Sequence, residues 1–384
     1  MKELQNYVEQ KKEKTIFLNL DFEKDRPFFT SQDALIQKLE LEFGSGKGIV
    51  FIDEMQRKEN AGLFLKGLYD MQLPYKFIVS GSGSLELKEK IHESLAGRKR
   101  FFELSTISFK EFVDFKTDYR YEGRLSNFFA VEREKAKFLL EEYLNFGGYP
   151  RVVLEEISSE KLKIIDEIYR SYMEKDVLYL LRVEKLDVFG SLIKLLASQI
   201  GGLVNYSEIA NTLGISVQTV KNYLQYTEKT FITNKISPFF RNKRKEITKS
   251  PIIYFNDYGL RNYAVGEFGR VGETGRFGFL FQNFVFNILK EKLSFSGASI
   301  HFWRTQEKAE VDFVVDFVAE VVPIEVKYKE FKEPKIERSL RSFISKYSPN
   351  RAFVVNKNLK CEVKLENTKI FFVPFGEFVA LEWG

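Results

Sequence analysis

The sequence predicts a multidomain α/β protein, and three observations along its 384 residues lead to that prediction. Short apolar runs alternate with a helical pattern in the N-terminal third, which is typical of a parallel sheet. Apolar residues then follow helical spacing through the middle of the chain. Runs rich in β-branched residues resume in the C-terminal third, so we expect a second α/β domain there. A chain of this length also exceeds what one hydrophobic core usually supports.

The composition is that of a folded protein without a membrane-spanning segment. Hydrophobic residues make up 44% and charged residues 29% of the chain, and no apolar run reaches the roughly 18 residues that a bilayer crossing needs. The charged N-terminus lacks the apolar stretch of a signal peptide, so we expect a cytoplasmic protein. With one Cys and two His, any metal site must be built from carboxylates. The net charge of +5 permits a nucleic-acid partner without requiring one.

The N-terminal third is predicted to form a parallel sheet. The runs that predict buried strands are Ile16–Leu20, Ile49–Ile52 and Phe77–Ser80. Between the last two, a helix is indicated by apolar residues at helical spacing, namely Leu63, Phe64, Leu68 and Met71. Catalytic residues in such sheets gather at the carboxyl ends of the strands. The second run ends in Asp53-Glu54, which makes these two residues the first candidates for a site.

An apolar strand that ends in Asp-Glu is the Walker B pattern, in which the Asp helps to hold Mg²⁺ and the Glu polarises the attacking water. The motifs that follow in order are Asp53-Glu54-Met55-Gln56, Ser80-Gly81-Ser82, Leu95-Ala96-Gly97-Arg98 and Leu104-Ser105-Thr106-Ile107-Ser108-Phe109. This ordered set resembles a prokaryotic AAA-type P-loop ATPase family whose C-terminal portion is a domain of unknown function. Taken without its neighbours, Asp53-Glu54 can also be read as a solvated strand end.

The resemblance implies roles for two further residues and implies ATP and Mg²⁺ as cofactors. Ser80 looks like the sensor of the γ-phosphate, and Arg98 looks like an arginine finger, which supplies positive charge to the transferred phosphoryl group. A Ser-Gly-Ser turn needs no ligand, however, and Arg98 belongs to the basic stretch 98–100, so a structural role stays open for both. If Arg98 acts on the nucleotide of a neighbouring subunit, the protein must form a homo-oligomer.

The sequence contains no G-x-x-x-x-G-K-[ST] motif, the loop whose backbone N–H groups and Lys hold the phosphates of ATP. The nearest match, Gly44–Gly48, has Gly after its Lys and precedes a strand, so we expect a turn there. The family's loop would lie before Ile16, where Met1–Thr15 are too short for a strand, a loop and a helix. We therefore expect an N-terminally truncated core, with a genuine remnant as the alternative, and poor ATP binding by this chain.

Four domains are predicted. They are a truncated AAA-type ATPase core at residues 1–115, a helical lid at 116–188, a winged helix-turn-helix at 189–248 and a nuclease-like domain at 249–384. The lid prediction rests on the helical periodicity of residues 130–181 and on the family resemblance. Phe146–Pro150 is expected to interrupt these helices, because Gly and Pro together break a helix.

Residues 206–224 carry the pattern of a helix-turn-helix. Ala210 is small where the two helices cross, Gly214 ends the first helix, and Ser216 caps the second. The side chains expected on the exposed face of the second helix are Gln218, Thr219, Lys221 and Asn222. A basic patch downstream contains Arg241, Lys243 and Arg244. DNA is therefore the predicted partner, although such folds also serve as protein contacts.

The C-terminal third is predicted to carry an acidic site on a sheet. The predicted strands are Ile252–Phe255, Ile300–Arg304, Val311–Val315, Ile324–Val326 and Ala352–Val355, with a helix at Phe279–Lys290. Asp312 lies in one strand, and Glu325 and Lys327 lie on the same side of the next. Two such carboxylates can hold Mg²⁺, and the Lys can orient or activate a water for attack on a phosphodiester.

This D…E-x-K arrangement resembles the PD-(D/E)xK nuclease superfamily, which implies a restriction-endonuclease-like α/β fold. An acidic residue often found on the preceding helix in that superfamily corresponds to Gln282 here, and Glu310 is the candidate substitute ligand. The alternative is that these charges only decorate an edge of the sheet, since many folds of this type have lost catalysis.

The sequence supports two hypotheses about function. The first is an ATP-dependent switch that acts on DNA, with a metal-dependent nuclease site in its C-terminal domain. The second is a regulatory or defence-type adaptor that binds protein or nucleic acid without catalysis. Magnesium-dependent DNA cleavage that is lost in Asp312→Ala or Lys327→Ala would separate the two hypotheses.

Overall fold

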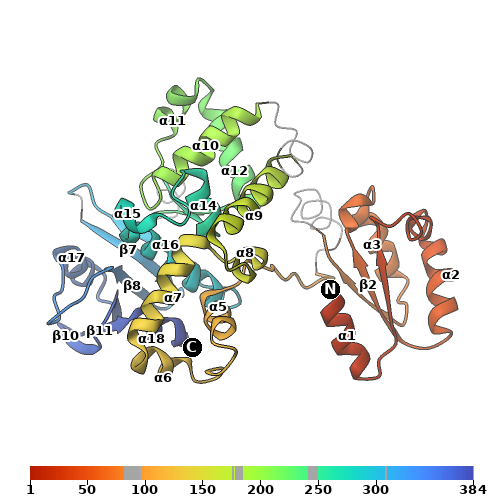
Figure 1. The fold of residues 1–384 in the computed structure, drawn as a ribbon, viewed down its shortest axis with the longest axis horizontal. Coiled ribbons are helices and arrows are strands. Elements are labelled where there is room, and N and C mark those ends of the chain that lie inside the picture. Colours follow the sequence, from red (N-terminus) through yellow and green to blue (C-terminus); the bar gives the residue numbers. More distant parts are fainter. Residues whose placement is uncertain are drawn as a thin grey trace. The chain divides into compact units, whose positions relative to one another are not determined.

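The computed structural model describes residues 1–81, 95, 97–174, 177, 185–240, 250–307 and 309–383. The chain divides into two compact units, one formed by residues 1–103 with 175–182 and the other by residues 104–174 with 183–384 (Figure 1). Both units combine helices with a sheet, which confirms the predicted α/β class. None of the helices in the described part of the chain combines the length and the apolar character that a bilayer crossing requires.

The first unit contains the predicted parallel sheet. Its strands run in the order β1-β2-β3, and both pairings are parallel. The elements are α1 (Lys2–Gln10), β1 (Thr15–Asn19), η1 (Arg26–Phe29), α2 (Gln32–Phe43), β2 (Gly48–Asp53), η2 (Met55–Arg57), α3 (Ala61–Asp70) and β3 (Tyr75–Val79). The three strands and the helix expected between the last two are therefore present.

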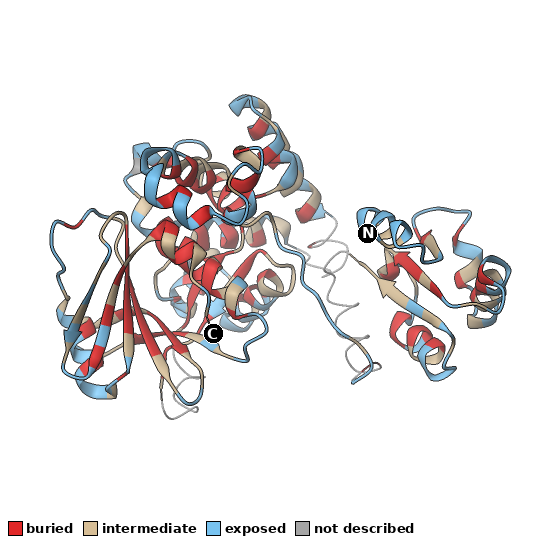
Figure 2. Ribbon diagram, turned by 90° about the horizontal axis from the view of Figure 1, so that it is seen from below, coloured by how far each residue is buried: buried red, intermediate tan, exposed pale blue. Residues whose placement is uncertain are grey.

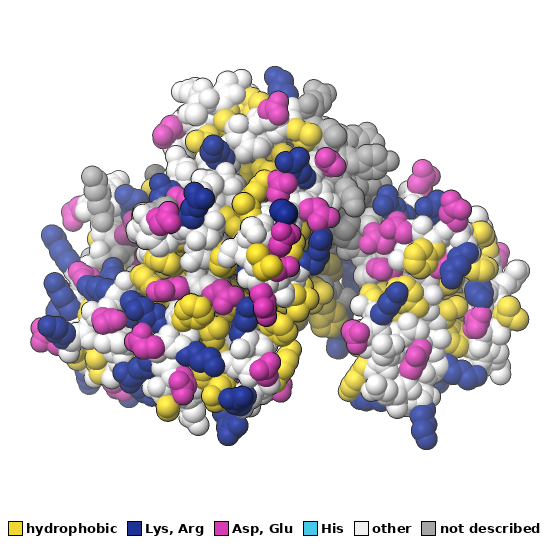
Figure 3. All heavy atoms as spheres, in the orientation of Figure 1, with side chains coloured by type: hydrophobic (Ala, Val, Ile, Leu, Met, Phe, Trp, Pro, Cys, Tyr) yellow, Lys and Arg dark blue, Asp and Glu magenta, His cyan; other side chains and the backbone are white. Residues whose placement is uncertain are grey.

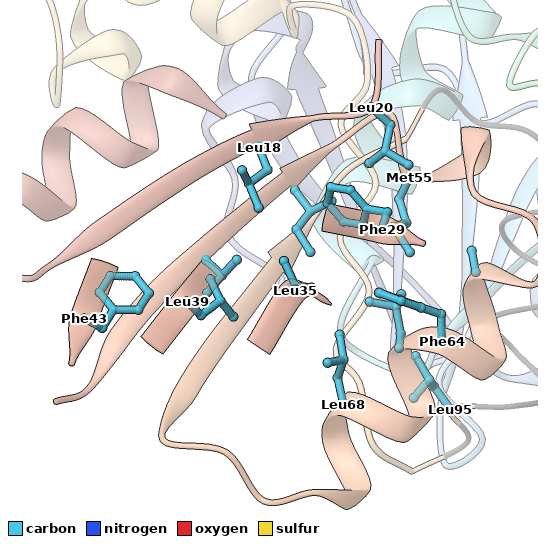
Figure 4. Close-up of a cluster of buried hydrophobic side chains, with 14 residues drawn as sticks. Leu18, Leu20, Phe29, Leu35, Leu39, Phe43, Met55, Phe64, Leu68 and Leu95 are labelled. Carbon is cyan, nitrogen blue, oxygen red and sulfur yellow. The ribbon is translucent and has the colours of Figure 1, made fainter. Parts of the chain in front are cut away.

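The core of this unit lies between the sheet and the helices α2 and α3 (Figure 4). Leu35 and Leu39 of α2 are fully buried, and Leu68 of α3 is nearly so. Two of the apolar residues that indicated this helix are exposed, since Leu63 is 63% accessible and Met71, directly after α3, is 45% accessible. The buried face of α3 runs through Ala61, Phe64, Leu65 and Leu68, which turns Leu63 and Met71 toward solvent.

The predicted turn at Gly44–Gly48 connects α2 to β2. Gly44 has φ +62°, a left-handed conformation that glycine adopts without strain, and its N–H bonds to the Glu40 carbonyl at the end of α2. β2 begins at Gly48, so the segment leads into a strand rather than opening a helix.

The second unit begins with a group of helices. They are α5 (Phe109–Lys116), α6 (Leu125–Val131), α7 (Arg133–Phe146), α8 (Pro150–Leu154) and α9 (Ser158–Ser171). The predicted interruption separates α7 from α8, where Gly147 has φ +78° and Pro150 starts the next helix. These helices pack against α14 (Tyr258–Ala264), α16 (Phe277–Leu293) and α18 (Phe375–Ala380). Of the segment predicted as a lid, residues 116–174 and 183–188 therefore belong to the same compact unit as the C-terminal sheet.

In this unit, two helices joined by a short turn occupy the segment for which a helix-turn-helix is predicted. After α10 (Leu186–Ser198), α11 (Tyr206–Leu213) and α12 (Val217–Lys229) are joined at Gly214, which has φ +63°. The Ser216 side chain accepts a hydrogen bond from the Thr219 N–H at 3.0 Å and caps α12. A short antiparallel pair follows, formed by β4 (Thr233–Ile236) and β5 (Ile252–Phe255).

The C-terminal sheet has six strands in the order β10-β11-β9-β8-β7-β6. They are β6 (Ser299–Arg304), β7 (Glu310–Asp316), β8 (Val321–Val326), β9 (Arg351–Asn356), β10 (Cys361–Leu365) and β11 (Thr368–Pro374). β6, β7 and β8 are antiparallel neighbours, whereas β9 pairs in parallel with both β8 and β11. Buried residues continue along these strands in Figure 2.

Helices cover both faces of this sheet. Ala352 and Val354 of β9 pack in one cluster with Leu340, Phe343 and Ile344 of α17 (Arg338–Tyr347). Phe353 points the other way, because side chains alternate along a strand, and its ring packs against those of Phe378 and Trp383. α16 also contacts β6 and β8. The predicted acidic residues of β7 and β8 lie in the middle of this layered arrangement.

Candidate functional site

The carboxyl edge of the N-terminal sheet brings Asp53 and Ser80 together. Asp53 ends β2, and Ser80 follows β3 on the neighbouring strand. The Ser80 hydroxyl donates a hydrogen bond to Asp53 Oδ1. Asn19, at the end of β1, places its amide nitrogen 3.5 Å from the other carboxylate oxygen. Sequence reasoning missed Asn19, although its place at the end of the first predicted strand was the signal that could have found it.

Glu54 follows Asp53 in a left-handed conformation with φ 57°. This is uncommon for a residue with a side chain and marks a tight change of direction at the strand end. The next residue, Met55, is fully buried, and its N–H bonds to the Ser80 carbonyl at 3.1 Å. The Glu54 carboxylate accepts a hydrogen bond from the Gln56 side chain. Asp53 and Glu54 are both partly accessible, so they can be reached by a ligand from solvent.

Arg98 is not brought to this edge within the first unit. Its guanidinium lies 3.4 Å from the Asp70 carboxylate and 5.8 Å from the ring centroid of Tyr69, both at the end of α3. In a parallel crossover, the helix returns from the carboxyl edge to the amino edge of the sheet. The ten residues of α3 span roughly 15 Å. Arg98 and Asp53 therefore lie at opposite edges of the same sheet.

The candidates on α12 form a mostly exposed polar face. The Gln218 amide donates to the Asn222 side chain at 3.0 Å, and the Lys221 ammonium lies 5.6 Å from the ring centroid of Tyr206. Thr219 is only partly accessible, and its hydroxyl lies 2.8 Å from that of Ser216 at the start of the helix. The other predicted contacts, Arg241, Lys243 and Arg244, lie outside the described residues, in the connection between β4 and β5.

A second acidic pair lies where β7 and β8 diverge. The two strands pair as far as Phe313 and Ile324. Beyond that point the Asp312 side chain replaces the backbone of β7 as the hydrogen-bond partner of β8. Its Oδ2 accepts a hydrogen bond from the Val326 N–H at 2.7 Å. Glu325 precedes Val326 on β8, and its Oε1 lies 2.8 Å from the Lys327 ammonium. The structure therefore brings the three predicted residues Asp312, Glu325 and Lys327 into one site, as their alternation indicated.

Burial dominates the electrostatics of this site. Glu325 is 4% exposed, and burial raises its pKa. Burial, followed by the nearby charge of Glu325, raises the pKa of Asp312 to about 7. For Lys327, burial acts to lower the pKa, but the charge and hydrogen bond of Glu325 outweigh it, so the pKa of Lys327 is raised. Near neutral pH, Asp312 therefore changes between its protonated and its ionised form, while Lys327 stays charged.

Gln282 completes the hydrogen bonding of Asp312. Its amide nitrogen, on α16, donates to Asp312 Oδ1 at 2.7 Å, so both carboxylate oxygens accept bonds from protein donors. Glu310, the expected substitute ligand, instead pairs with Arg304 at 3.4 Å. Within the described ranges, no three His, Cys, Asp or Glu side chains are grouped to hold a metal ion. The donor set fits a divalent ion only in part, through the buried Glu325 Oε2, which has no hydrogen-bond partner.

Comparisons with known proteins match three parts of the sequence. Residues 1–113 match the model of an AAA domain. Residues 137–270 match a domain of unknown function (DUF8612), and residues 277–378 match another (DUF4143). The AAA match covers the sheet that carries Asp53 and Ser80, and the DUF4143 match covers the site at Asp312.

Three relatives span most of this chain, and each is an uncharacterized protein. One from Methanocaldococcus jannaschii is 25% identical over 94% of this chain and 76% of its own length. One from Mycobacterium tuberculosis is 27% identical over 77% of this chain and 62% of its own length. One from Haemophilus influenzae is 27% identical over 72% of this chain and 65% of its own length. The chain thus spans less than two thirds of the last two relatives.

The family models settle the broad class of the chain. An AAA domain indicates an ATPase-like protein, for which nucleotide and Mg²⁺ are the usual ligands. The chain therefore combines a match to a P-loop AAA-type domain at its N-terminus with a match to a domain of unknown function (DUF4143) at its C-terminus.

Proposed function

We propose that this chain is an AAA-type nucleotide-binding switch that acts on DNA, with its nucleotide site at the carboxyl edge of the β1–β3 sheet. The observation that carries the proposal is the hydrogen bond from Ser80 to Asp53 across two neighbouring strands. It joins the residue that would hold Mg²⁺ to the residue that would sense the terminal phosphate. Ligands of parallel α/β sheets bind at this edge.

Each residue at this edge has a distinct role in the proposal. Asp53 is partly accessible and fits a hydrated Mg²⁺, which would neutralise the charge of the phosphates. Ser80 and Asn19 fix the orientation of the Asp53 carboxylate. Glu54 would orient the water that attacks the terminal phosphate. Arg98, at the opposite edge, would act only on the nucleotide of a neighbouring copy, which makes a homo-oligomer part of the proposal.

The nucleotide part is tested by binding of Mg-ATP to the 384-residue chain. Because the sequence lacks G-x-x-x-x-G-K-[ST], we expect weak affinity, with a dissociation constant above about 0.1 mM. At a few millimolar Mg-ATP, hydrogen exchange should slow at the ends of β2 and β3. Asp53→Asn should abolish this protection, whereas Asp33→Asn, at an exposed position of α2, should not. Nanomolar affinity, or protection that Asp53→Asn leaves intact, would contradict the proposed site.

The DNA part is supported by α12 and the elements around it. Helices α11 and α12, followed by the β4–β5 pair, have the order of a winged helix, and Gln218, Lys221 and Asn222 are exposed on α12. The basic residues 241–245 lie between the two strands in the sequence, where a wing would be. On the face drawn in Figure 3, cationic and anionic side chains are interspersed, so the local pattern carries this argument rather than the net charge.

Duplex binding at several salt concentrations tests the DNA part. If Lys221 contacts a phosphate, Lys221→Gln should weaken binding several-fold and reduce the salt slope by about one. Lys194→Gln, at an exposed position of α10, is the matched control and should change neither. If no duplex binds at any salt concentration, the adaptor hypothesis is favoured instead.

A second candidate function, phosphodiester cleavage, is supported by the β7–β8 site. The observation that favours it is the pairing of Lys327 with Glu325 beside Asp312. DNA and RNA incubated with the chain and Mg²⁺ should then be cut, and Asp312→Ala or Lys327→Ala should abolish cutting. Lys332→Ala, at an exposed position beyond β8, should not. No cutting of either nucleic acid would sink this second candidate and leave the nucleotide site unaffected.

A further inference from the structure

In the β7–β8 site, the amide of Gln282 is oriented the opposite way from that of a metal ligand. Gln282 is 8% exposed, and it directs the nitrogen of its amide, rather than the oxygen, at Asp312. An amide nitrogen donates hydrogen bonds and cannot coordinate a cation. The oxygen that could act as a ligand points elsewhere.

The amide oxygen of Gln282 faces Gly201, in the loop between α10 and α11. A Cβ added at Gly201 would lie 2.7 Å from Gln282 Oε1, so there is no space for a side chain behind the amide. Gly201 has φ +75°, and its N–H bonds to the Ile253 carbonyl at 3.5 Å. A flip of the amide would set its oxygen against the Asp312 carboxylate, which places two acceptors face to face, so the amide nitrogen stays on the Asp312 side.

Both oxygens of Asp312 already accept a hydrogen bond in this arrangement. Its Oδ1 accepts from Gln282 and its Oδ2 from the Val326 N–H, both at 2.7 Å. Each oxygen keeps a second lone pair, but a divalent ion prefers several oxygen ligands, and at Asp312 the Gln282 amide presents a hydrogen-bond donor where a further ligand would be needed. Glu325 Oε2 is buried without a partner, whereas Oε1 is held by Lys327. One oxygen of Glu325 thus has no hydrogen-bond partner, next to an Asp312 carboxylate that already accepts two hydrogen bonds.

We propose that Gln282 holds the β7–β8 site in a state that excludes divalent cations, by occupying Asp312 with a hydrogen-bond donor where a metal centre would need a ligand. Gln282 is a positioning residue, because it acts on the site through Asp312. The inference rests on the site of the second candidate function, but it concerns the binding of an ion and not cleavage.

The test is calorimetric binding of Mn²⁺ to the full chain, in an Asp53→Asn background that removes the candidate site of the first unit. Without further change, we expect no saturable binding that Asp312→Asn removes. Gln282→Glu replaces the donor with a carboxylate at nearly constant size. It should create one Mn²⁺ site per chain, with an affinity at least about tenfold higher than that of any Mn²⁺ binding by the parent with Gln282. A second substitution, Asp312→Asn, should abolish that site.

Two further variants separate exclusion from the gain of a charge. Gln282→Met removes the amide without adding a ligand, and we expect it to permit weak Mn²⁺ binding that depends on Asp312. Gln306→Glu adds the same charge at an exposed turn and should create no site. Fluorescence of Trp303 and Trp383, both in the second unit, checks that each variant is folded.

The outcomes distinguish the inference from the function on which it rests. Mn²⁺ binding by the chain with Gln282 intact, lost in Asp312→Asn, would overturn the inference, as would a Gln282→Met variant that binds no more ion than its parent. If Gln282→Glu binds Mn²⁺ as expected but neither it nor the parent cuts nucleic acid, the inference stands and the nuclease function fails.

Discussion

The two candidate sites use the same element of structure in different ways. In each, an Asp where the pairing of two strands stops accepts a hydrogen bond from a polar side chain elsewhere in the same unit. Asp53 is partly accessible, and its partners Ser80 and Asn19 lie at neighbouring strand ends. Asp312 is also partly accessible, but its partner Gln282 and its neighbour Glu325 are buried.

This difference predicts which site is coupled to stability. An accessible carboxylate exchanges its protein partners for water or a ligand at little cost, whereas a buried one is stable only with the partners that the fold supplies. Changes at the β7–β8 site should therefore alter the unfolding of the second unit, and changes at the N-terminal edge should alter mainly ligand binding. Both Trp residues lie in the second unit, so Trp fluorescence reports on that unit by itself.

The largest expected effect is on the pH dependence of stability through Asp312. Its pKa in the folded protein, about 7, lies above the ordinary value of about 3.9. Between these values the folded state binds more protons than the unfolded state, so this group stabilises at low pH and the contribution is lost as pH rises toward 7. The loss is on the order of 4 kcal/mol. Urea unfolding from pH 5 to pH 8, followed by Trp fluorescence, measures the part of this loss that falls between those pH values, about 3 kcal/mol.

Asp312→Asn removes the titrating group and should flatten the profile of unfolding free energy against pH in this range. Glu333→Gln removes one carboxylate at an exposed position and should leave the profile as it is. If the profiles of wild type and Asp312→Asn run parallel, Asp312 is not held as the structure shows, and the contrast between the two sites is lost.

The next largest effect is expected for Lys327→Met. It leaves Glu325, which is buried and carries an unpartnered Oε2, without its cation. Removing one partner of a buried ion pair costs about 3 kcal/mol, and the same fluorescence measurement reports it. Lys332→Met, an exposed position after β8, should cost less than about 0.5 kcal/mol. Equal effects of the two substitutions would mean that the pair contributes no more than a surface charge.

The sequence predicts those parts of the two sites that depend on local pattern. Asp53, Ser80, Asp312 and Glu325 are found because strands are recognisable as apolar runs and side chains alternate along them. Gly214 and Ser216 mark the turn of the helix-turn-helix for the same reason, since each acts within one turn of chain. These features require no knowledge of what packs on them.

What the sequence could not predict depends on packing between distant segments. Leu63 and Met71 fit the helical period of α3, yet the sheet determines which side of the helix is buried. The bond between Gln282 and Asp312 joins residues 30 positions apart and exists only because α16 lies across the sheet. Alignment with a superfamily pattern identifies Gln282 as a missing ligand, but only the geometry shows that it is a hydrogen-bond donor to Asp312.

A smaller effect is expected at the loop behind Gln282. Gly201→Ala would place a Cβ 2.7 Å from Gln282 Oε1, and the flexible amide can withdraw only by giving up its bond to Asp312. Gly297 is the matched control, because it has a similar φ of +72° and no atom within 4 Å of its added Cβ. Both substitutions should lower the free energy of unfolding by about 1 kcal/mol, because each places alanine at a positive φ. Gly201→Ala should lower it by about 1 kcal/mol more, because the hydrogen bond to Asp312 is lost.

The extra loss of stability in Gly201→Ala should disappear in a Gln282→Ala background, because no Gln282 amide remains to be displaced. A double-mutant cycle on urea unfolding measures this coupling. If the extra loss of stability persists without Gln282, it arises from the backbone of the loop instead. The loop would then not be part of the arrangement that distinguishes the second site from the first.

The smallest effect is expected for Ser80→Ala at the N-terminal edge. The hydroxyl bonds to Asp53, which stays partly accessible, so water can replace the lost donor. The cost should be about 0.5–1 kcal/mol, seen as a two- to fivefold loss of hydrogen-exchange protection in β2 and β3. Ser45→Ala, in the exposed turn before β2, should change nothing. A loss as large as that of Lys327→Met would show that the bond between Ser80 and Asp53 supports the fold itself, and the two sites would then differ in chemistry but not in their coupling to stability.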